Sequence, residues 1–114
     1  MRETTAIDQL ADDYTRALLE RSPLLATELG VPGSEHLLDD LSPAGAASQA
    51  DLDRRTLAAL DALTPVDDTD AVTAASLRDR LGLNLESYEA GDHARDLNNI
   101  ASPIQVVRNV FDLM

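Results

Sequence analysis

Apolar residues recur every three or four positions along several stretches of this chain, most clearly over Ala71–Ala90. Positions three and four apart share one face of an α-helix, so this stretch predicts a long amphipathic helix. Its apolar face would carry Ala74, Leu77, Leu81, Leu85 and Tyr88. We expect this helix to supply the surface on which the rest of the chain packs. At Gly82, inside it, we expect a neighbouring helix to approach closely or the helix to kink.

A first helix is expected to begin at Thr4 or Thr5 and to end around Glu20–Arg21. Thr5 and Asp8 have the spacing of a capping box, in which each side chain bonds the other residue's backbone N–H. The inward stripe of this helix would consist of Ile7, Leu10, Ala11, Tyr14, Ala17 and Leu18.

Three Ser-Pro pairs predict further helix starts: Ser22-Pro23, Ser42-Pro43 and Ser102-Pro103. Ser is a good N-cap, and Pro at the first helical position lacks only an N–H that would have no helical partner there. The first pair predicts a short helix closed by Gly30. The second predicts a helix to about Leu63, and the third predicts a helix over Ser102–Leu113.

Between the helices, the pattern makes several smaller predictions. The last residues of the acidic run 67–70 are expected to cap the helix that follows. Two carboxylate–guanidinium pairs have helical i,i+4 spacing, Asp12 with Arg16 and Asp51 with Arg55. We also expect inward-facing or packed positions at Leu37, Leu38, Leu41, Leu52, Ala59, Leu60 and Leu63.

The last predicted helix is apolar around much of its circumference, through Ile104, Val106, Val107, Val110 and Phe111. Such a helix is normally buried on most sides, and residues 1–103 offer only limited cover. We therefore expect missing C-terminal sequence to cover it. The predicted fold is all-α: an antiparallel helical bundle of about five helices, the last truncated, in one N-terminal domain over residues 1–114.

Charge excludes two classes of partner. Nine basic residues against 21 acidic ones give a net charge of −12. Nucleic acid and anionic membrane surfaces both require clustered Lys and Arg, so we expect neither as a partner. The chain has no Cys, which excludes disulfides and thiolate metal sites. No signal-like apolar segment opens the chain, and we expect a cytoplasmic protein.

Candidate chemistry is sparse. His36 and His93 are isolated histidines without converging ligands, so we expect no metal or other cofactor in this chain. No zinc-peptidase, nucleophile-elbow or phosphate-loop motif is present. The polar turn before the last helix is more distinctive, and Arg95, Asn98 and Asn99 are candidates for contact with a ligand. The alternative is an ordinary helix connection whose Asn side chains bond local backbone.

Three segments resemble the N-terminal region of the bacterial DUF885 family. They are the run Arg21–Gly30 followed by Leu41-Ser42-Pro43, the run Leu77–Gly91, and the turn Arg95–Gln105 with its continuation to Leu113. The resemblance implies a longer parent protein of helical gluzincin type, a zinc-dependent peptidase with an HExxH motif in its later part. No residue here matches that motif, so no catalytic residue is transferred and the chain alone is expected to be inactive.

Two functions of different classes remain open. In the first, the chain is the N-terminal helical scaffold of a DUF885 peptidase-like hydrolase, and its partner is the missing C-terminal catalytic part. Under this hypothesis Arg95, Asn98 and Asn99 would form one wall of a substrate cleft. In the second, it is a free-standing interaction module that uses the apolar Ile104–Met114 face. That face could bind a partner helix or form a homodimer through Ile104, Val107, Val110 and Phe111.

Overall fold

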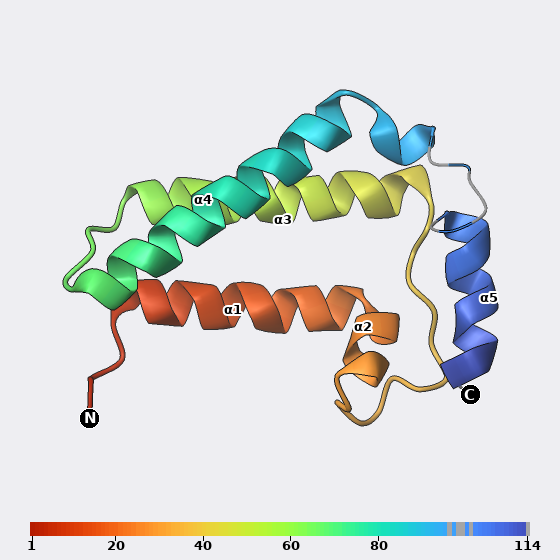
Figure 1. Ribbon diagram of the computed structural model, residues 1–114, viewed down its shortest axis with the longest axis horizontal. Coiled ribbons are helices and arrows are strands. Elements are labelled where there is room, and N and C mark those ends of the chain that lie inside the picture. The colour runs from red at the N-terminus through yellow and green to blue at the C-terminus, as the bar shows by residue number, and fades with distance from the viewer. Residues whose placement is uncertain (96, 98–99, 101, 114) are drawn as a thin grey trace.

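A computed structural model describes residues 1–95, 97, 100 and 102–113 of the protein. Its elements are α1 (Ala6–Arg21), α2 (Pro23–Glu28), α3 (Pro43–Asp61), α4 (Asp68–Glu89), the short 3₁₀ helix η1 (Asp92–Ala94) and α5 (Pro103–Leu113) (Figure 1). No strand occurs within the described ranges. The predicted all-α class and the five α-helices are therefore confirmed.

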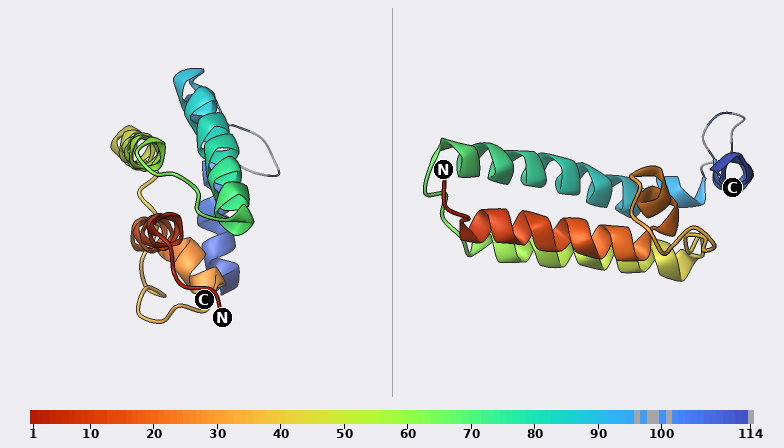
Figure 2. Two further views of the ribbon diagram at one scale, coloured as in Figure 1. Left: turned by 90° about the vertical axis from the view of Figure 1, so that its left-hand side faces the viewer. Right: turned by 90° about the horizontal axis from the view of Figure 1, so that it is seen from below.

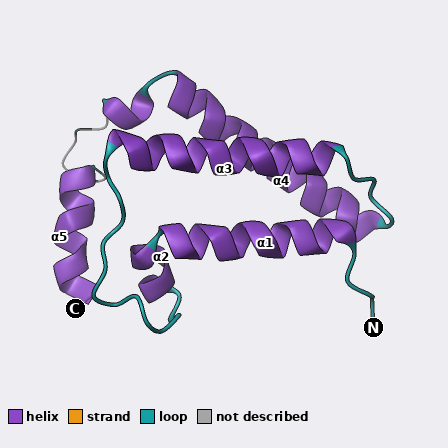
Figure 3. Cartoon of the chain, turned by 180° about the vertical axis from the view of Figure 1, so that it is seen from behind, coloured by secondary structure: helices purple, strands orange, loops and turns teal. Residues whose placement is uncertain are grey.

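The long helices α1, α3 and α4 form the bundle. α3 runs antiparallel to α1 and to α4, and each of the three contacts the other two (Figure 1). The short α2 turns away at the end of α1, and α5 lies crosswise at that same end, where it contacts α2 (Figure 2). The connection between α2 and α3 passes beside α5 (Figure 3). None of the described helices has the length and hydropathy of a bilayer span.

The helix starts confirm most of the predicted caps. Thr5 and Asp8 form the full capping box of α1, with Thr5 Oγ1 accepting from the Asp8 N–H at 3.1 Å. Ser22 and Ser42 cap α2 and α3 through their hydroxyl oxygens. α4 begins earlier than predicted, because Asp67, the first acidic residue of its run, accepts from the Asp70 N–H at 2.8 Å.

The core lies where the three long helices meet. Ile7, Leu60 and Ala74 are almost fully buried and come from α1, α3 and α4, with Leu10, Leu63 and Leu77 packed around them. Leu81 is also buried, so the predicted inward face of α4 is confirmed. Aliphatic contact between helices provides this cohesion, since the chain has few aromatic residues.

Several expected contacts are wrong. Leu37, Leu38 and Leu41 are 47, 56 and 48 % exposed, because the loop that carries them runs beside α5 and away from the three-helix core (Figure 3). Ala59 is exposed on α3. A Cβ at Gly82 would meet no atom within 4 Å, so close approach of another helix does not explain this glycine.

The predicted surface pairs form with different partners. Arg16 bonds Asp13 at 3.0 Å, and Arg54 bonds Asp51 at 3.1 Å. Arg55 donates instead to the Asp51 backbone carbonyl, at 3.4 Å. Residues three and four apart are both neighbours on a helix surface, so spacing alone did not decide between adjacent candidates.

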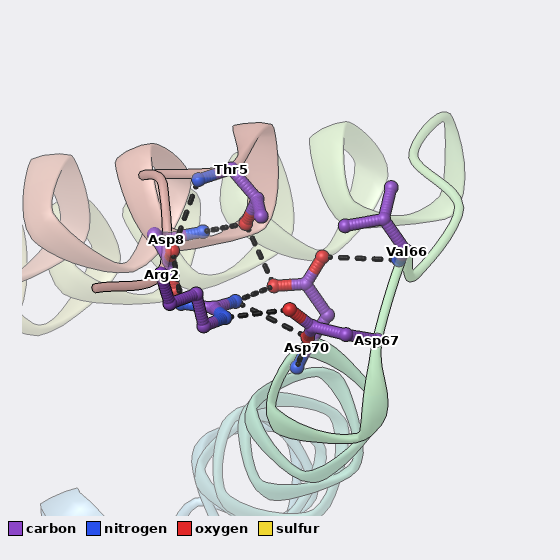
Figure 4. Close-up of polar contacts among 6 residues, drawn as sticks. All are labelled: Arg2, Thr5, Asp8, Val66, Asp67 and Asp70. Carbon is purple, nitrogen blue, oxygen red and sulfur yellow. Dashed lines mark hydrogen bonds and ion pairs between the residues drawn. The ribbon is translucent and has the colours of Figure 1, made fainter.

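A cluster of charged residues joins the starts of α1 and α4 (Figure 4). The Arg2 guanidinium bonds Asp8, Asp67 and Asp70, each at 2.6 Å. The Asp70 carboxylate, whose residue has no exposed surface, also accepts from Thr5 Oγ1 at 2.7 Å. This cluster fixes the N-terminal segment against α4.

The cluster shifts two carboxyl pKa values in one direction. The hydrogen bond from Arg2 and, to a smaller extent, the one from the Asp70 N–H lower the pKa of Asp67. The hydrogen bond from the Thr5 backbone N–H and, to a smaller extent, the one from Arg2 lower the pKa of Asp8. In turn, Asp67 and then Asp8 raise the pKa of Arg2. Each charged form is therefore favoured in the folded state.

Candidate functional site

An open cleft of about 450 Å³ lies at the end of the bundle where α3 begins. We call it the end cleft. Its walls come from the end of α1, the loop before α3, the start of α3, η1 and the start of α5. The lining residues are Arg21, Ser22, Asp39, Asp40, Leu41, Ser42, Pro43, Gly45, Ala46, Gln49, His93, Ala94 and Pro103.

Arg21 is the cation of the end cleft, and α3 holds it in place. Its guanidinium donates to Ser48 Oγ at 2.6 Å, to the Gly45 carbonyl at 3.1 Å and to Gln49 Oε1 at 3.2 Å. These bonds tie the last turn of α1 to the first two turns of α3. The side chain is thus a structural tie between helices.

The two carboxylates of the end cleft also act as local caps. Asp39 accepts from Ser22 Oγ at 2.7 Å and from the Leu24 N–H at 3.0 Å, which fixes the loop to the start of α2. Asp40 accepts from the Ser42 N–H at 2.9 Å, and bonds from Ser42 lower the pKa of Asp40. Within the part of the chain that the structure describes, neither carboxylate bonds a histidine or lysine as an acid–base couple would require.

A second pocket, of about 240 Å³, lies between α3 and α4 and shares Ala46, Gln49 and His93 with the end cleft. We call it the Asp53 pocket. Its lining residues are Ala46, Gln49, Ala50, Asp53, Asn84, Ser87, Tyr88 and His93. It combines one carboxylate, amides, a hydroxyl and two aromatic rings with the small side chains of α3.

Asp53 is 2 % exposed and is held by neutral donors. Tyr14 Oη donates to Asp53 Oδ1 at 2.9 Å, and Gln49 Nε2 donates to the same oxygen at 3.0 Å. Burial, and then the hydrogen bond to Asp53, raises the pKa of Tyr14. The phenol therefore stays protonated and acts as a donor to the carboxylate.

The aromatic wall of the Asp53 pocket follows from the end of α4. Gly91 takes a positive φ of 78°, which stops the helix and turns the chain into η1. The His93 ring then stacks on Tyr88 at 4.7 Å between centroids, with 17° between planes. This confirms that Gly91 breaks the helix between Glu89 and His93.

The predicted cleft-wall residues are only partly placed. Arg95 is described, and it closes the end of α4 by donating to the Ala90 carbonyl and, at 3.2 Å, to Asp92. Its side chain is 68 % exposed and lines an open depression with Ser87, Asp92 and His93. Asn98 and Asn99 lie outside the described residues.

The donor set does not fit the zinc that the family resemblance implies. Among residues 1–95, 97, 100 and 102–113, no three His, Cys, Asp or Glu side chains converge as a metal site would require. His36 instead lines a small apolar groove with Leu37, Leu38 and three residues of α5.

The Asp53 pocket was not predicted, because the sequence analysis gives Asp53 no role. A signal was present: Asp53 and Thr56 precede Leu60 by seven and four positions, which places all three on one helix face. The partner Tyr14 is 39 residues away, and no local pattern links it to Asp53.

The other candidate surface is α5. Ile104, Val107 and Phe111 are 64, 42 and 73 % exposed, although a helix this apolar is normally covered. α5 forms a groove of about 190 Å³ with four residues of the loop between α2 and α3: Glu35, His36, Leu37 and Leu38. The prediction that residues 1–103 leave this helix poorly covered is confirmed.

No curated protein matches the chain. A family model does match it over residues 23–114, and its description is "Bacterial protein of unknown function (DUF885)". The match begins at the start of α2 and includes the α3 walls of both pockets, the α4 wall of the Asp53 pocket, η1 and α5. The chain belongs to the DUF885 family.

Proposed function

We propose that this chain is the N-terminal helical scaffold of a cytoplasmic, zinc-dependent peptidase-like hydrolase of the DUF885 family, and that it is not catalytic by itself. The observation that carries the proposal is the uncovered apolar side of α5. Full burial of one large aliphatic or aromatic side chain contributes about 1.5–3 kcal/mol. Much of this stabilisation is missing on α5, because Ile104, Val107 and Phe111 remain largely exposed. Contact with a catalytic part would recover it.

The position of Arg95 supports a second element of the proposal. Arg95 follows η1, which borders both the end cleft and the Asp53 pocket. We propose that Arg95, Asn98 and Asn99 form one wall of a substrate cleft whose other walls belong to the catalytic part. The zinc ligands and the general base would also come from that part, since this chain lacks a suitable donor set among its described residues.

The runner-up is a free-standing interaction module in which the same apolar face binds a partner helix or a second copy. The exposure of Ile104, Val107 and Phe111 favours it equally. Charge weighs against the homodimer, because each copy carries a net charge of −12 and like-charged surfaces repel. A partner without strong negative charge would avoid this cost.

Reading the gene past codon 114 separates the two functions. An open frame that encodes HExxH agrees with the scaffold proposal, and a stop codon directly after Met114 contradicts it. The whole encoded polypeptide should then hydrolyse unstructured peptides and lose this activity with a chelator. The purified 114-residue chain should show no hydrolysis with or without added zinc. Chelator-sensitive hydrolysis by the short chain would contradict the assignment of catalysis to another part.

A further inference from the structure

Asp53 is a buried carboxylate that no cation of the described chain neutralises. Its residue is 2 % exposed, and it forms no ion pair within residues 1–95, 97, 100 and 102–113. Its hydrogen-bond donors, Tyr14 and Gln49, are both neutral and both bond Oδ1. A buried charge is costly unless it is paired, so an uncompensated carboxylate at this position favours a cationic ligand.

The second oxygen, Asp53 Oδ2, is available to such a ligand. Oδ2 accepts no hydrogen bond from the described residues. Every side-chain nitrogen or oxygen of those residues that is fully buried does have a hydrogen-bond partner. Oδ2 must therefore keep contact with solvent, and Asp53 lines the pocket between α3 and α4.

The rest of the Asp53 pocket suits an alkylammonium group. An –NH₃⁺ group has three donors and no acceptor. Asn84 and Ser87 also line the pocket, and their side chains carry an amide oxygen and a hydroxyl oxygen. The Ser87 hydroxyl donates its proton to Asp92 at 3.1 Å, so its oxygen can still accept from an ammonium group. Ala46 and Ala50, with the flat Tyr88–His93 stack, supply apolar walls for the methylene chain.

The neighbouring basic residues do not compete for Asp53. Arg54 lies 5.7 Å from the centre of the Tyr88 ring, and its charge is paired with Asp51 at 3.1 Å and Glu89 at 3.9 Å. Arg21 donates to Gln49 Oε1 at 3.2 Å, while the other end of the same amide, Nε2, bonds Asp53. The net charge of −12 adds a long-range attraction for cations.

We propose that the Asp53 pocket binds a primary ammonium group on an alkyl or peptide chain, with Asp53 Oδ2 as the charged acceptor. The proposal does not depend on the scaffold function. An organic cation fits better than a metal ion, because a divalent cation needs several converging oxygen ligands and the pocket offers one carboxylate.

The first test is a titration of the ¹⁵N-labelled chain with n-butylammonium chloride, followed by amide chemical shifts. n-Butanol, which has the same chain but no charge, is the control ligand. We expect saturable shifts among residues 49–53 and 84–88 with the ammonium and none with the alcohol. The absence of saturable shifts there, or equal shifts with the alcohol, overturns the proposal.

Two variants and one matched control decide the role of the carboxylate. Asp53→Asn keeps the shape and removes the charge, and should weaken binding about ten- to hundredfold. Asn84→Leu fills the pocket with an apolar side chain and should also weaken binding of the ammonium about ten- to hundredfold. Because Asn84 is exposed, this variant should fold, and it tests the site even if Asp53→Asn does not fold. Asp61→Asn removes an equal charge from the exposed end of α3 and should bind as the parent does. Equal weakening by Asp61→Asn would reduce the effect to general electrostatics and overturn the site.

Further ligands identify the natural source of the ammonium. Triglycine carries it at a peptide amino terminus, and Nα-acetyl-lysine amide carries it on a side chain. Tighter binding of one than of the other by the parent chain, abolished by Asp53→Asn, assigns that source to the site. Nα-acetyl-triglycine, which lacks the ammonium, should not bind, and binding of this peptide at the same amides would contradict recognition of the charge.

Discussion

Leu81 gives the sharpest test of how α4 packs. It is 1 % exposed, while Leu83, two residues further along the same helix, is 52 % exposed. Leu→Ala removes three carbon atoms, which lose about 0.8 kcal/mol of transfer free energy each when buried. The cavity left behind adds to this loss, so Leu81→Ala should lower the free energy of unfolding by about 2–5 kcal/mol. Leu83→Ala should cost about 1 kcal/mol or less.

Urea unfolding followed by circular dichroism at 222 nm measures both variants. The midpoint should fall much further for Leu81→Ala, with the slope m unchanged in both, because neither change alters the surface exposed on unfolding very much. A difference between the two variants below about 0.5 kcal/mol would refute the assigned inward face of α4.

Two further predictions concern stability. Gly82→Ala should raise the free energy of unfolding by about 0.5–1 kcal/mol, because a Cβ there meets no atom within 4 Å and Ala is the better helix former; destabilisation in the same urea assay would contradict this. Arg2→Gln should destabilise the chain at pH 7, where the lowered pKa values of Asp8 and Asp67 stabilise the fold. That contribution is present above the unfolded carboxyl pKa of about 3.9 and is lost as pH falls through the lower folded values. The urea midpoints of parent and Arg2→Gln should therefore converge below about pH 4, and a gap that stays constant to pH 2 would contradict the role of the cluster.

The helix starts could be predicted because caps are local. Thr5 with Asp8, and Ser22 and Ser42 each followed by Pro, bond backbone groups within three residues. The start of α4 was misplaced because residues 67–70 offer several competing caps, and Asp67 is the one used. Spacing identifies such candidates without ranking them.

Contacts between distant segments could not be predicted. Arg2 meets Asp70 across 68 positions, and Tyr14 meets Asp53 across 39. The local pattern predicts Asp70 only as a candidate cap and predicts no role for Asp53, because the burial of both carboxylates arises only once the helices are assembled. The predicted cleft wall is also only partly tested. Arg95 bonds the end of α4 and Asp92, and the role of Asn98 and Asn99 stays a prediction.

The uncovered side of α5 is the basis of the proposed function, and thiol labelling tests it most directly. The chain has no Cys, so Phe111→Cys and, as a control, Leu83→Cys each introduce a single thiol. Both positions are exposed in the 114-residue chain, and both thiols should react rapidly with a disulfide reagent there. In the whole polypeptide that the gene encodes, the thiol at position 111 should react at least tenfold more slowly and the thiol at position 83 at an unchanged rate. Equal rates at position 111 in the two polypeptides would contradict the scaffold proposal.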